Sequence, residues 1–207
     1  MSIHKIIDLT QVFVDNMPVH LESKPPRLIK TSTFGPDAFS DWKIESDMHV
    51  GTHIDGPAHI SNLTTLISQI PVEQFVGTGV IVDVRGTEYI DTSVLAGLPD
   101  KPGLIVLFYS GRDKYFNDPS YFSDHPVLTP ACAHELVCRK VKMIGIDFYS
   151  PDRHPYEVHQ ILCAHNILIV ENLTHLDALV DESCFTVIAL PLKTETDSAL
   201  ARVIAIV

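Results

Sequence analysis

Four side chains that can bind a metal ion lie within 11 positions, in the stretch HVGTHIDGPAH: His49, His53, Asp55 and His59. In a straight strand these positions would point to one side, but His49 and His53 would lie about 13 Å apart. In a continuous helix His49 and His53 would share one face, while Asp55 and His59 would share another. Neither regular structure gathers all four, so the sequence predicts a loop that curls them inward.

The residues between these four favour such a loop. Gly51 and Gly56 tolerate positive φ angles, and Pro57 fixes its own φ and ends regular structure. The alternative is a polar loop that is rich in histidine and binds no metal. Four potential metal ligands within 11 positions favour the metal site over this alternative.

Residues from elsewhere in the chain are needed to complete such a site. Glu171 ends the apolar run ILIVE, and the carboxyl end of a buried strand is where α/β proteins place chemistry. His159 lies on the expected helix before that strand, at the border of its apolar side. Each also has a structural interpretation. Glu171 could be a strand-end charge that reaches water, and His159 could be a surface or half-buried helix histidine. Asp147, which ends MIGID, is expected either to support the ligands or to be structural.

Histidine and carboxylate ligands without a nearby thiolate favour Zn²⁺ or Mn²⁺ over Fe²⁺. Asp55 could bridge two ions, with one further pair of ligands on each: His49 and His53, and His159 and Glu171. A divalent ion lowers the pKa of the water that it coordinates, which makes that water a nucleophile at neutral pH. His59 would stay free for proton transfer, a task that suits an imidazole.

The composition excludes several classes of protein. The 207 residues are 45% hydrophobic and 20% charged, which is typical of a globular chain, and we expect one domain over residues 1–207. The formal net charge of −11 argues against nucleic acid or an anionic membrane as a partner. The N-terminus lacks the features of a signal peptide, and no apolar run approaches the ~18 residues of a membrane span. We therefore expect a cytoplasmic protein that acts on a small molecule.

The elements that must position these residues alternate between buried strands and helices. Strands are expected within 5–10, 41–50, 78–86, 104–109, 143–150, 167–173, 185–193 and 201–207, and helices over 128–141, with Thr129 as N-cap, and 154–166. Residues 15–41 carry four prolines and are expected to form a long ordered loop or flap. The four cysteines form no CxxC pair and lie in apolar surroundings, which predicts buried reduced thiols. The pattern predicts an α/β fold with a mixed sheet.

The motif that runs from His49 to His59 resembles the HxGTHxDxPxH motif of the cyclase family, which includes the bacterial kynurenine formamidases and isatin hydrolase. All seven fixed residue types match. DLT near the start, GID at 145–147, the run 171–173 and the run 191–193 also sit as in that family. The resemblance implies a swivelling β/β/α fold, a metal-dependent hydrolase, and a homodimer or another oligomer built from dimers.

The resemblance also implies a role for each candidate residue. By position, the first metal has the ligands His49, His53 and Asp55, the second has Asp55, His159 and Glu171, and the proton-shuttling catalytic histidine is His59. The implied reaction is hydrolysis of a C–N bond in a small (aryl)formamide or cyclic amide. A lactone or ester would fit the same machinery. The motif is also compatible with a non-catalytic metal-binding protein of this fold, and with a lyase or isomerase.

Two segments depart from the family pattern. The kynurenine formamidases carry a tryptophan that packs on the substrate in the loop after the first strand, and here His20 stands at about that place. The sole tryptophan, Trp42, lies elsewhere. After Pro191-Leu192-Lys193 the family's glycine-rich turn is replaced by TETDSALAR. We therefore expect a different wall of the pocket and treat His20 as a candidate substrate contact.

Overall fold

A mixed β-sheet that closes into a barrel forms the centre of the computed structural model, which describes residues 5–20 and 23–207. Its strands are β1 (Ile6–Asp8), β4 (His53–Asp55), β5 (Val76–Asp83), β7 (Ile105–Tyr109), β9 (Met143–Ile146), β10 (Leu168–Glu171), β11 (Phe185–Pro191) and β12 (Ser198–Ile206). Their order is β1-β12-β11-β5-β7-β9-β10-β4, and β4 also pairs with β12. That last pairing closes the ring, and β1 lies beside β12 outside it.

Within this sheet, β5, β7, β9 and β10 pair in parallel, and the other neighbours are antiparallel. Every residue of β7, β9 and β10 is buried, because these strands are covered on both faces. Val106 and Ile144 pack in the core cluster that contains the helices, whereas Leu107 and Met143 pack in the cluster inside the barrel. The predicted α/β fold with a mixed sheet is therefore confirmed.

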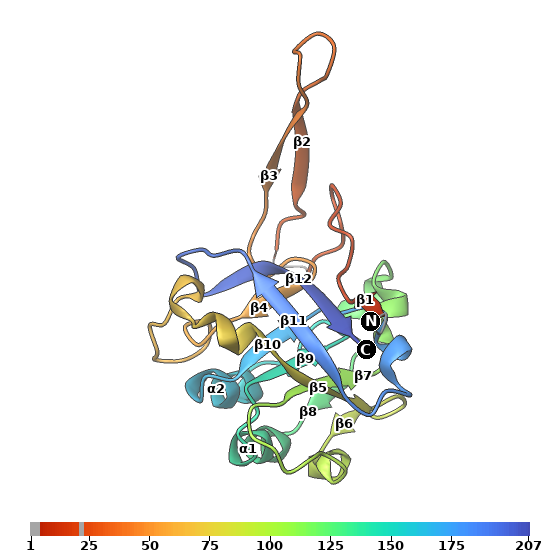
Figure 1. Cartoon of the computed structure of the whole chain (residues 1–207), viewed down its shortest axis with the longest axis vertical. Coiled ribbons are helices and arrows are strands. Elements are labelled where there is room, and N and C mark those ends of the chain that lie inside the picture. The colour runs from red at the N-terminus through yellow and green to blue at the C-terminus, as the bar shows by residue number, and fades with distance from the viewer. Residues whose placement is uncertain (1–4, 21–22) are drawn as a thin grey trace.

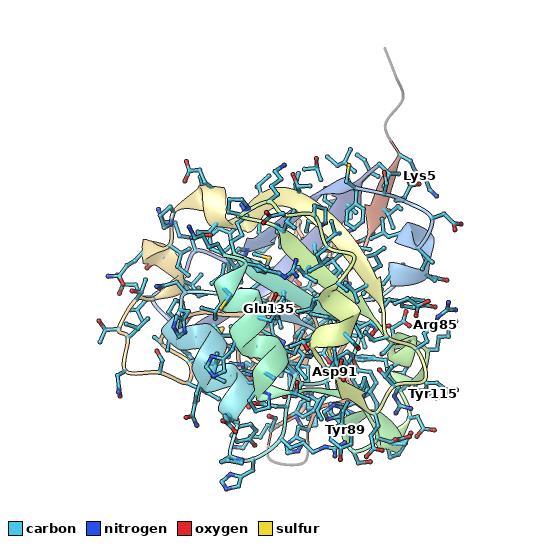
Figure 2. The ribbon with its side chains drawn as sticks, turned by 90° about the horizontal axis from the view of Figure 1, so that it is seen from below. Lys5, Arg85, Tyr89, Asp91, Tyr115 and Glu135 are labelled. Atoms are coloured by element: carbon cyan, nitrogen blue, oxygen red, sulfur yellow. The ribbon has the colours of Figure 1, made fainter. Side chains whose placement is uncertain are left out.

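Helices α1 (Pro130–Cys138) and α2 (Glu157–Ala164) lie side by side across one face of the barrel, as Figure 2 shows from below with Glu135 on α1. Thr129 caps α1 as predicted, since its hydroxyl oxygen accepts a hydrogen bond from the Cys132 N–H. Because α2 directly precedes β10, the chain brings a helix residue and a strand-end residue to the same edge of the sheet.

Short elements connect the barrel strands. They are the 3₁₀ helices η1 (Ile67–Gln69), η2 (Val72–Phe75), η3 (Thr92–Leu95), η4 (Arg112–Tyr115), η5 (Pro119–Phe122) and η6 (Leu176–Leu179), and the paired strands β6 (Tyr89–Ile90) and β8 (Val127–Leu128). Among the described residues, no helix combines the length and the apolar character that crossing a membrane would require.

Strands β2 (Arg27–Ser32) and β3 (Asp41–Glu45) form an antiparallel hairpin that projects away from the barrel (Figure 1). The expectation of a long loop or flap over residues 15–41 is therefore wrong for Arg27–Ser32, which form a strand. The prolines that suggested a loop lie before β2 or between the two strands, where they remove no hydrogen bond from the pairing. The hairpin exposes large apolar side chains, Phe34 and Trp42 among them.

The cysteines are all free, as expected, but only Cys132 and Cys163 are buried. Cys138 and Cys184 are exposed, which corrects the expectation that all of them would be buried. Cys138 ends α1, and Cys184 stands directly before β11. The apolar neighbours that suggested burial belong to the adjoining core elements.

Candidate metal centre

A pocket of about 270 Å³ opens at the edge of the barrel where β4 meets β10. Its wall contains five of the six candidate residues: His49, Asp55, His59, His159 and Glu171. The sixth, His53, is buried beside them, with its Nε2 3.4 Å from a carboxylate oxygen of Glu171. The fold therefore gathers all six candidates in one place, although they come from widely separated parts of the sequence.

Part of the histidine-rich stretch is a strand. Residues His53–Asp55 form β4, which pairs with β10 on one side and β12 on the other. Ile54 packs into the barrel core, so His53 and Asp55 both point to the opposite side. The prediction of a loop throughout is wrong for these three residues, because two neighbouring strands supply hydrogen bonds that the local sequence does not reveal. Glu171 lies directly opposite His53 in this pairing.

The entry to β4 is held by Asn172, which follows Glu171. The side-chain amide of Asn172 donates to the Gly51 carbonyl at 3.0 Å, and the Thr52 hydroxyl donates to the Asn172 carbonyl at 2.7 Å. Gly51 has a φ of +63°, a conformation that glycine adopts at no steric cost. These contacts fix the direction in which the chain turns from His49 into His53.

Carboxylates and imidazoles converge at the bottom of the pocket. His53 Nε2 lies 3.4 Å from Asp55 Oδ1 and 3.4 Å from Glu171 Oε2. His159 Nε2 lies 3.4 Å from Glu171 Oε1 and 3.9 Å from Asp55 Oδ2. The two histidines thus approach the same pair of carboxylates, from β4 and from α2.

The second ring nitrogen of each histidine is occupied. His53 Nδ1 lies 2.8 Å from the Gly51 carbonyl oxygen, and His159 Nδ1 lies 2.5 Å from Asp152 Oδ1. Protein ligands of metals are oriented in this way, with the outer ring N–H donated to a carbonyl or carboxylate. The arrangement leaves each Nε2 free to face the two carboxylates.

His49 has the reverse orientation. Its Nδ1 lies 2.8 Å from Asp55 Oδ1 without the alignment of a hydrogen bond, and its Nε2 lies 2.8 Å from the hydroxyl of Ser198. Ser198 begins β12 and is paired with Asp55. The register of these strands therefore brings a third imidazole to the same carboxylate.

Three buried polar atoms at this point lack a hydrogen-bond partner among the described residues: His53 Nε2 and both carboxylate oxygens of Asp55. Leaving such atoms unsatisfied costs about 1–3 kcal/mol each, and more for a charged group. A divalent cation between them would satisfy all three at once. The donor set of imidazole nitrogens and carboxylate oxygens therefore fits a metal ion.

The carboxylates also change the protonation of the histidines. Burial by itself lowers the pKa of His49, but its contact with Asp55 and the charges of Asp55 and Glu171 raise that pKa to about 9. Burial opposes protonation of His159 as well, but its hydrogen bond with Asp152 and its contact with Glu171 raise its pKa to about 10. Burial works to raise the pKa of Asp55, and the facing histidines hold it well below its ordinary value. The ionised carboxylates of the cluster therefore favour a nearby positive charge, either on the histidines or on a bound cation.

His59 lines the same pocket but is more exposed than the buried cluster. A ring nitrogen of His59 and single ligand atoms of Asp55 and His159 lie within 4.8 Å of one another. Its Nδ1 lies 2.9 Å from Asp197 Oδ2. Asp197 belongs to the segment TETDSALAR, for which we expected only a different wall. The sole signal in the sequence was an acidic side chain four residues before the strand expected over 201–207.

Asp152 was also missed by the sequence reasoning. Besides the His159 ring, it accepts hydrogen bonds from the backbone N–H groups of Val158 and His159 in the first turn of α2. An acidic residue shortly before a helix was the available signal. Asp147, by contrast, accepts from Ser110 and Gly111 after β7, so of its two expected roles the structure supports the structural one.

His20 lines the pocket, and its ring stacks on that of Tyr149 with centroids 4.9 Å apart. Tyr149 and Tyr156 also line the pocket. The pocket therefore combines an ionic bottom with an aromatic side. A substrate contact by His20 remains a prediction that this geometry permits.

Comparisons with known proteins agree with this site. A family model described as "Putative cyclase" matches residues 7–153. A kynurenine formamidase of Bacillus mycoides is 30% identical, with 78% of each chain covered. An uncharacterised protein of Methanocaldococcus jannaschii is 31% identical over 98% of this chain and 99% of its own.

Solved structures share the fold. Isatin hydrolase A from Labrenzia aggregata has a TM-score of 0.87 at 23% identity, covering 99% of this chain and 94% of its own. A structure described as a potential metal-dependent hydrolase with cyclase activity has a TM-score of 0.83 at 26% identity, covering 99% of this chain and 98% of its own. The likeness thus extends over the whole barrel and the elements that carry the pocket.

Proposed function

Since this chain belongs to the cyclase family and is a metal-dependent hydrolase, we propose that it cleaves a C–N bond in a small (aryl)formamide or a cyclic amide. The observation that carries the proposal is the buried cluster at Asp55. Its two carboxylate oxygens and the facing His53 Nε2 have no hydrogen-bond partner in the part of the chain that the structure describes. A binding site for a divalent ion at the bottom of an open pocket is the simplest arrangement that accounts for it.

The residues that would hold the metal are those brought together at the bottom of the pocket. We propose His49, His53 and Asp55 for one ion and Asp55, His159 and Glu171 for a second, with Zn²⁺ as the resident metal and Mn²⁺ as the alternative. When bound, the ion supplies Lewis-acid polarisation of the scissile carbonyl and activates water at neutral pH.

His59 would act as the general acid and base. It is half-exposed beside the cluster, where it can reach both the ions and a bound substrate. It takes a proton from the attacking water as the new C–O bond forms. It then returns that proton to the leaving nitrogen as the C–N bond breaks, so the ring ends the cycle as it began.

The aromatic side of the pocket favours a flat substrate. His20, Tyr149 and Tyr156 present rings to the space above the cluster. A planar aryl amide could stack there, since offset stacking of aromatic rings is favourable by about 0.5–1.5 kcal/mol. This lining supports an aryl formamide or a fused cyclic amide over an aliphatic ester or lactone.

The test is metal content and hydrolysis measured on the same sample. The chain is purified in metal-replete medium, and N-formylkynurenine, isatin, simple formamides and lactones are screened with and without chelator. We expect stoichiometric metal and chelator-sensitive cleavage of an amide in the set. Metal without turnover of any amide would overturn the proposed reaction, and cleavage only of lactones would replace it by ester hydrolysis.

We also propose that the chain forms a homodimer, or a larger oligomer built from it. The projecting hairpin exposes Phe34, Phe39, Trp42 and Ile44 by 52–76%, and a two-stranded hairpin is marginal in water by itself. Light scattering should give twice the mass of one chain. Trp42→Ser should lower that mass, whereas Tyr89→Ser, at an equally exposed position on β6 (Figure 2), should not. A monomeric wild type would contradict the proposal.

A further inference from the structure

We propose that Asp197 is a positioning residue that fixes the orientation of the His59 ring, an inference that rests on the proposed role of His59 in proton transfer. Asp197 Oδ2 lies 2.9 Å from His59 Nδ1 and 3.4 Å from His49 Nε2. One carboxylate oxygen therefore faces both a proposed metal ligand and the proposed general base. The rings of His49 and His59 lie with their centroids 4.1 Å apart.

The shorter of these two contacts belongs to His59. His49 Nε2 already has the Ser198 hydroxyl at 2.8 Å, so its ring is held without Asp197. Asp197 is the hydrogen-bonding partner found for the His59 ring among the described residues. The carboxylate thus has its main effect on the ring that is proposed to transfer the proton.

The backbone holds Asp197 in place beside His59. The Gly56 N–H donates to the Asp197 carbonyl at 2.8 Å, and the His59 N–H donates to the Gly56 carbonyl at 3.1 Å. A Cβ atom at Gly56 would lie 2.8 Å from the Asp197 carbonyl oxygen, so only glycine permits this approach. The segment before β12 is anchored further by the Thr196 hydroxyl, which donates to the Ser198 carbonyl at 2.6 Å.

This contact selects one tautomer of the neutral ring. A carboxylate can only accept a hydrogen bond, so it stabilises the form of His59 that carries its proton on Nδ1. The lone pair then resides on Nε2, the nitrogen left to accept a proton from water. Without Asp197 the ring would divide its time between tautomers and orientations, and fewer molecules would be ready to react.

Two substitutions and a matched control test this role. Asp197→Ala should lower kcat by about 10- to 100-fold, the range found when the hydrogen-bonding partner of a metal-ligating histidine is removed. KM and metal content should change little, because Ser198 still holds the His49 ring and the other proposed ligands do not contact Asp197. Asp197→Asn, whose carbonyl can still accept from Nδ1–H, should recover part of the loss. Glu195→Ala removes an equal charge from an exposed position of the same segment and should match wild type.

Nitrogen-15 NMR of the metal-free protein gives a measurement that does not depend on turnover. At a pH where the ring is neutral, we expect His59 in the Nδ1–H tautomer in wild type and in Asp197→Asn. In Asp197→Ala we expect a shift towards the Nε2–H tautomer that predominates in water. His59 signals are assigned by their absence in His59→Asn.

The outcomes separate this inference from the proposed reaction. Unchanged His59 signals in Asp197→Ala would overturn the positioning role, whether or not an amide is cleaved. A shifted tautomer in a protein without hydrolase activity would support the positioning role and count against the reaction. Loss of metal in Asp197→Ala would also overturn the inference, because it would show that Asp197 is needed for metal binding.

Discussion

The bottom of the pocket and its rim are built in different ways. The bottom consists of His53, Asp55, His159 and Glu171, which are 1–5% exposed and stand on β4, α2 and β10. The rim consists of His49, His59 and Asp197, whose side chains are 23–41% exposed and lie outside the strands and helices.

The difference indicates a division of labour. Burying four ionisable groups on rigid elements is costly unless something neutralises them, which favours a bound cation at the bottom. At the rim, the half-exposed His59 imidazole beside Asp197 can exchange protons with substrate and solvent, which favours acid–base chemistry there. His49 joins the two regions, because it lies at the rim and is also a proposed metal ligand. If the two regions divide the work in this way, substitutions in them should have separable effects.

The largest effect is expected from Asp55→Ala at the bottom of the pocket. Asp55 faces all three proposed histidine ligands, so its loss should release the metal and lower turnover by at least about 10³-fold, more than the 10–100-fold typical of outer partners. Metal analysis and kinetics on one preparation would show this. A variant that kept its full metal content would remove Asp55 from the ligand set.

His59→Ala should have the largest effect at the rim. Loss of a general acid and base should lower kcat by about 10²–10⁴-fold. Metal content should stay at the wild-type level, because all the proposed ligands remain. Were the metal lost together with activity, His59 would be a ligand and the division between the two regions would fail.

Asp152→Ala tests the support beneath the bottom of the pocket. Asp152 holds the His159 ring and caps the first turn of α2, so its removal should weaken metal binding by about 10- to 100-fold. Competition with a chromophoric chelator measures the affinity. Asp147→Ala, which removes a buried carboxylate from another part of the fold, is the matched control for general destabilisation. Equal losses of metal affinity in both variants would show that Asp152 has no particular role.

The smallest expected effect is a pH dependence of the stability of the metal-free protein. In the metal-free chain the pKa values of His49 and His159 are about 9 and about 10, above the ordinary value of 6.5. Their protonated forms therefore stabilise the metal-free fold fully below pH about 6.5, and this contribution is lost as pH rises through 9 to 10. We expect the melting temperature of the metal-free protein to fall over that interval.

Metal uptake at pH 7 should release protons, since both histidines must lose theirs to bind. Titration calorimetry in two buffers with different ionisation enthalpies measures the number released. Uptake without proton release would mean that His49 and His159 are neutral in the metal-free protein or do not bind the metal.

Much of the fold followed from the sequence because buried strands and capped helices have local signals. The run ILIVE and the Thr129-Pro130 pair predicted β10 and α1 to within a few residues. Strand β2 was missed because the prolines around it dominated the local pattern, whereas β3 lies within the strand expected over 41–50. Strand β4 was missed because its three residues depend on hydrogen bonds from β10 and β12.

The site, too, has residues that the sequence revealed and residues that it did not. Motif spacing singled out the residues from His49 to His59 because they are close in sequence. Asp197 could not be found by spacing, since 138 positions separate it from its partner His59. Only the pairing of β12 with β4 brings it to the pocket. Two residues that strand pairing brings together across a long stretch of sequence share no spacing that a motif search could detect.

The central claim is that the buried cluster at Asp55 binds a divalent metal, and X-ray absorption at the zinc edge tests it most directly. The metal-free chain would be loaded with Zn²⁺ and dialysed before measurement. We predict stoichiometric zinc with nitrogen and oxygen neighbours at about 2.0–2.2 Å and the outer-shell scattering of imidazole. Absence of tightly held zinc, or a sulfur shell at about 2.3 Å, would contradict the account.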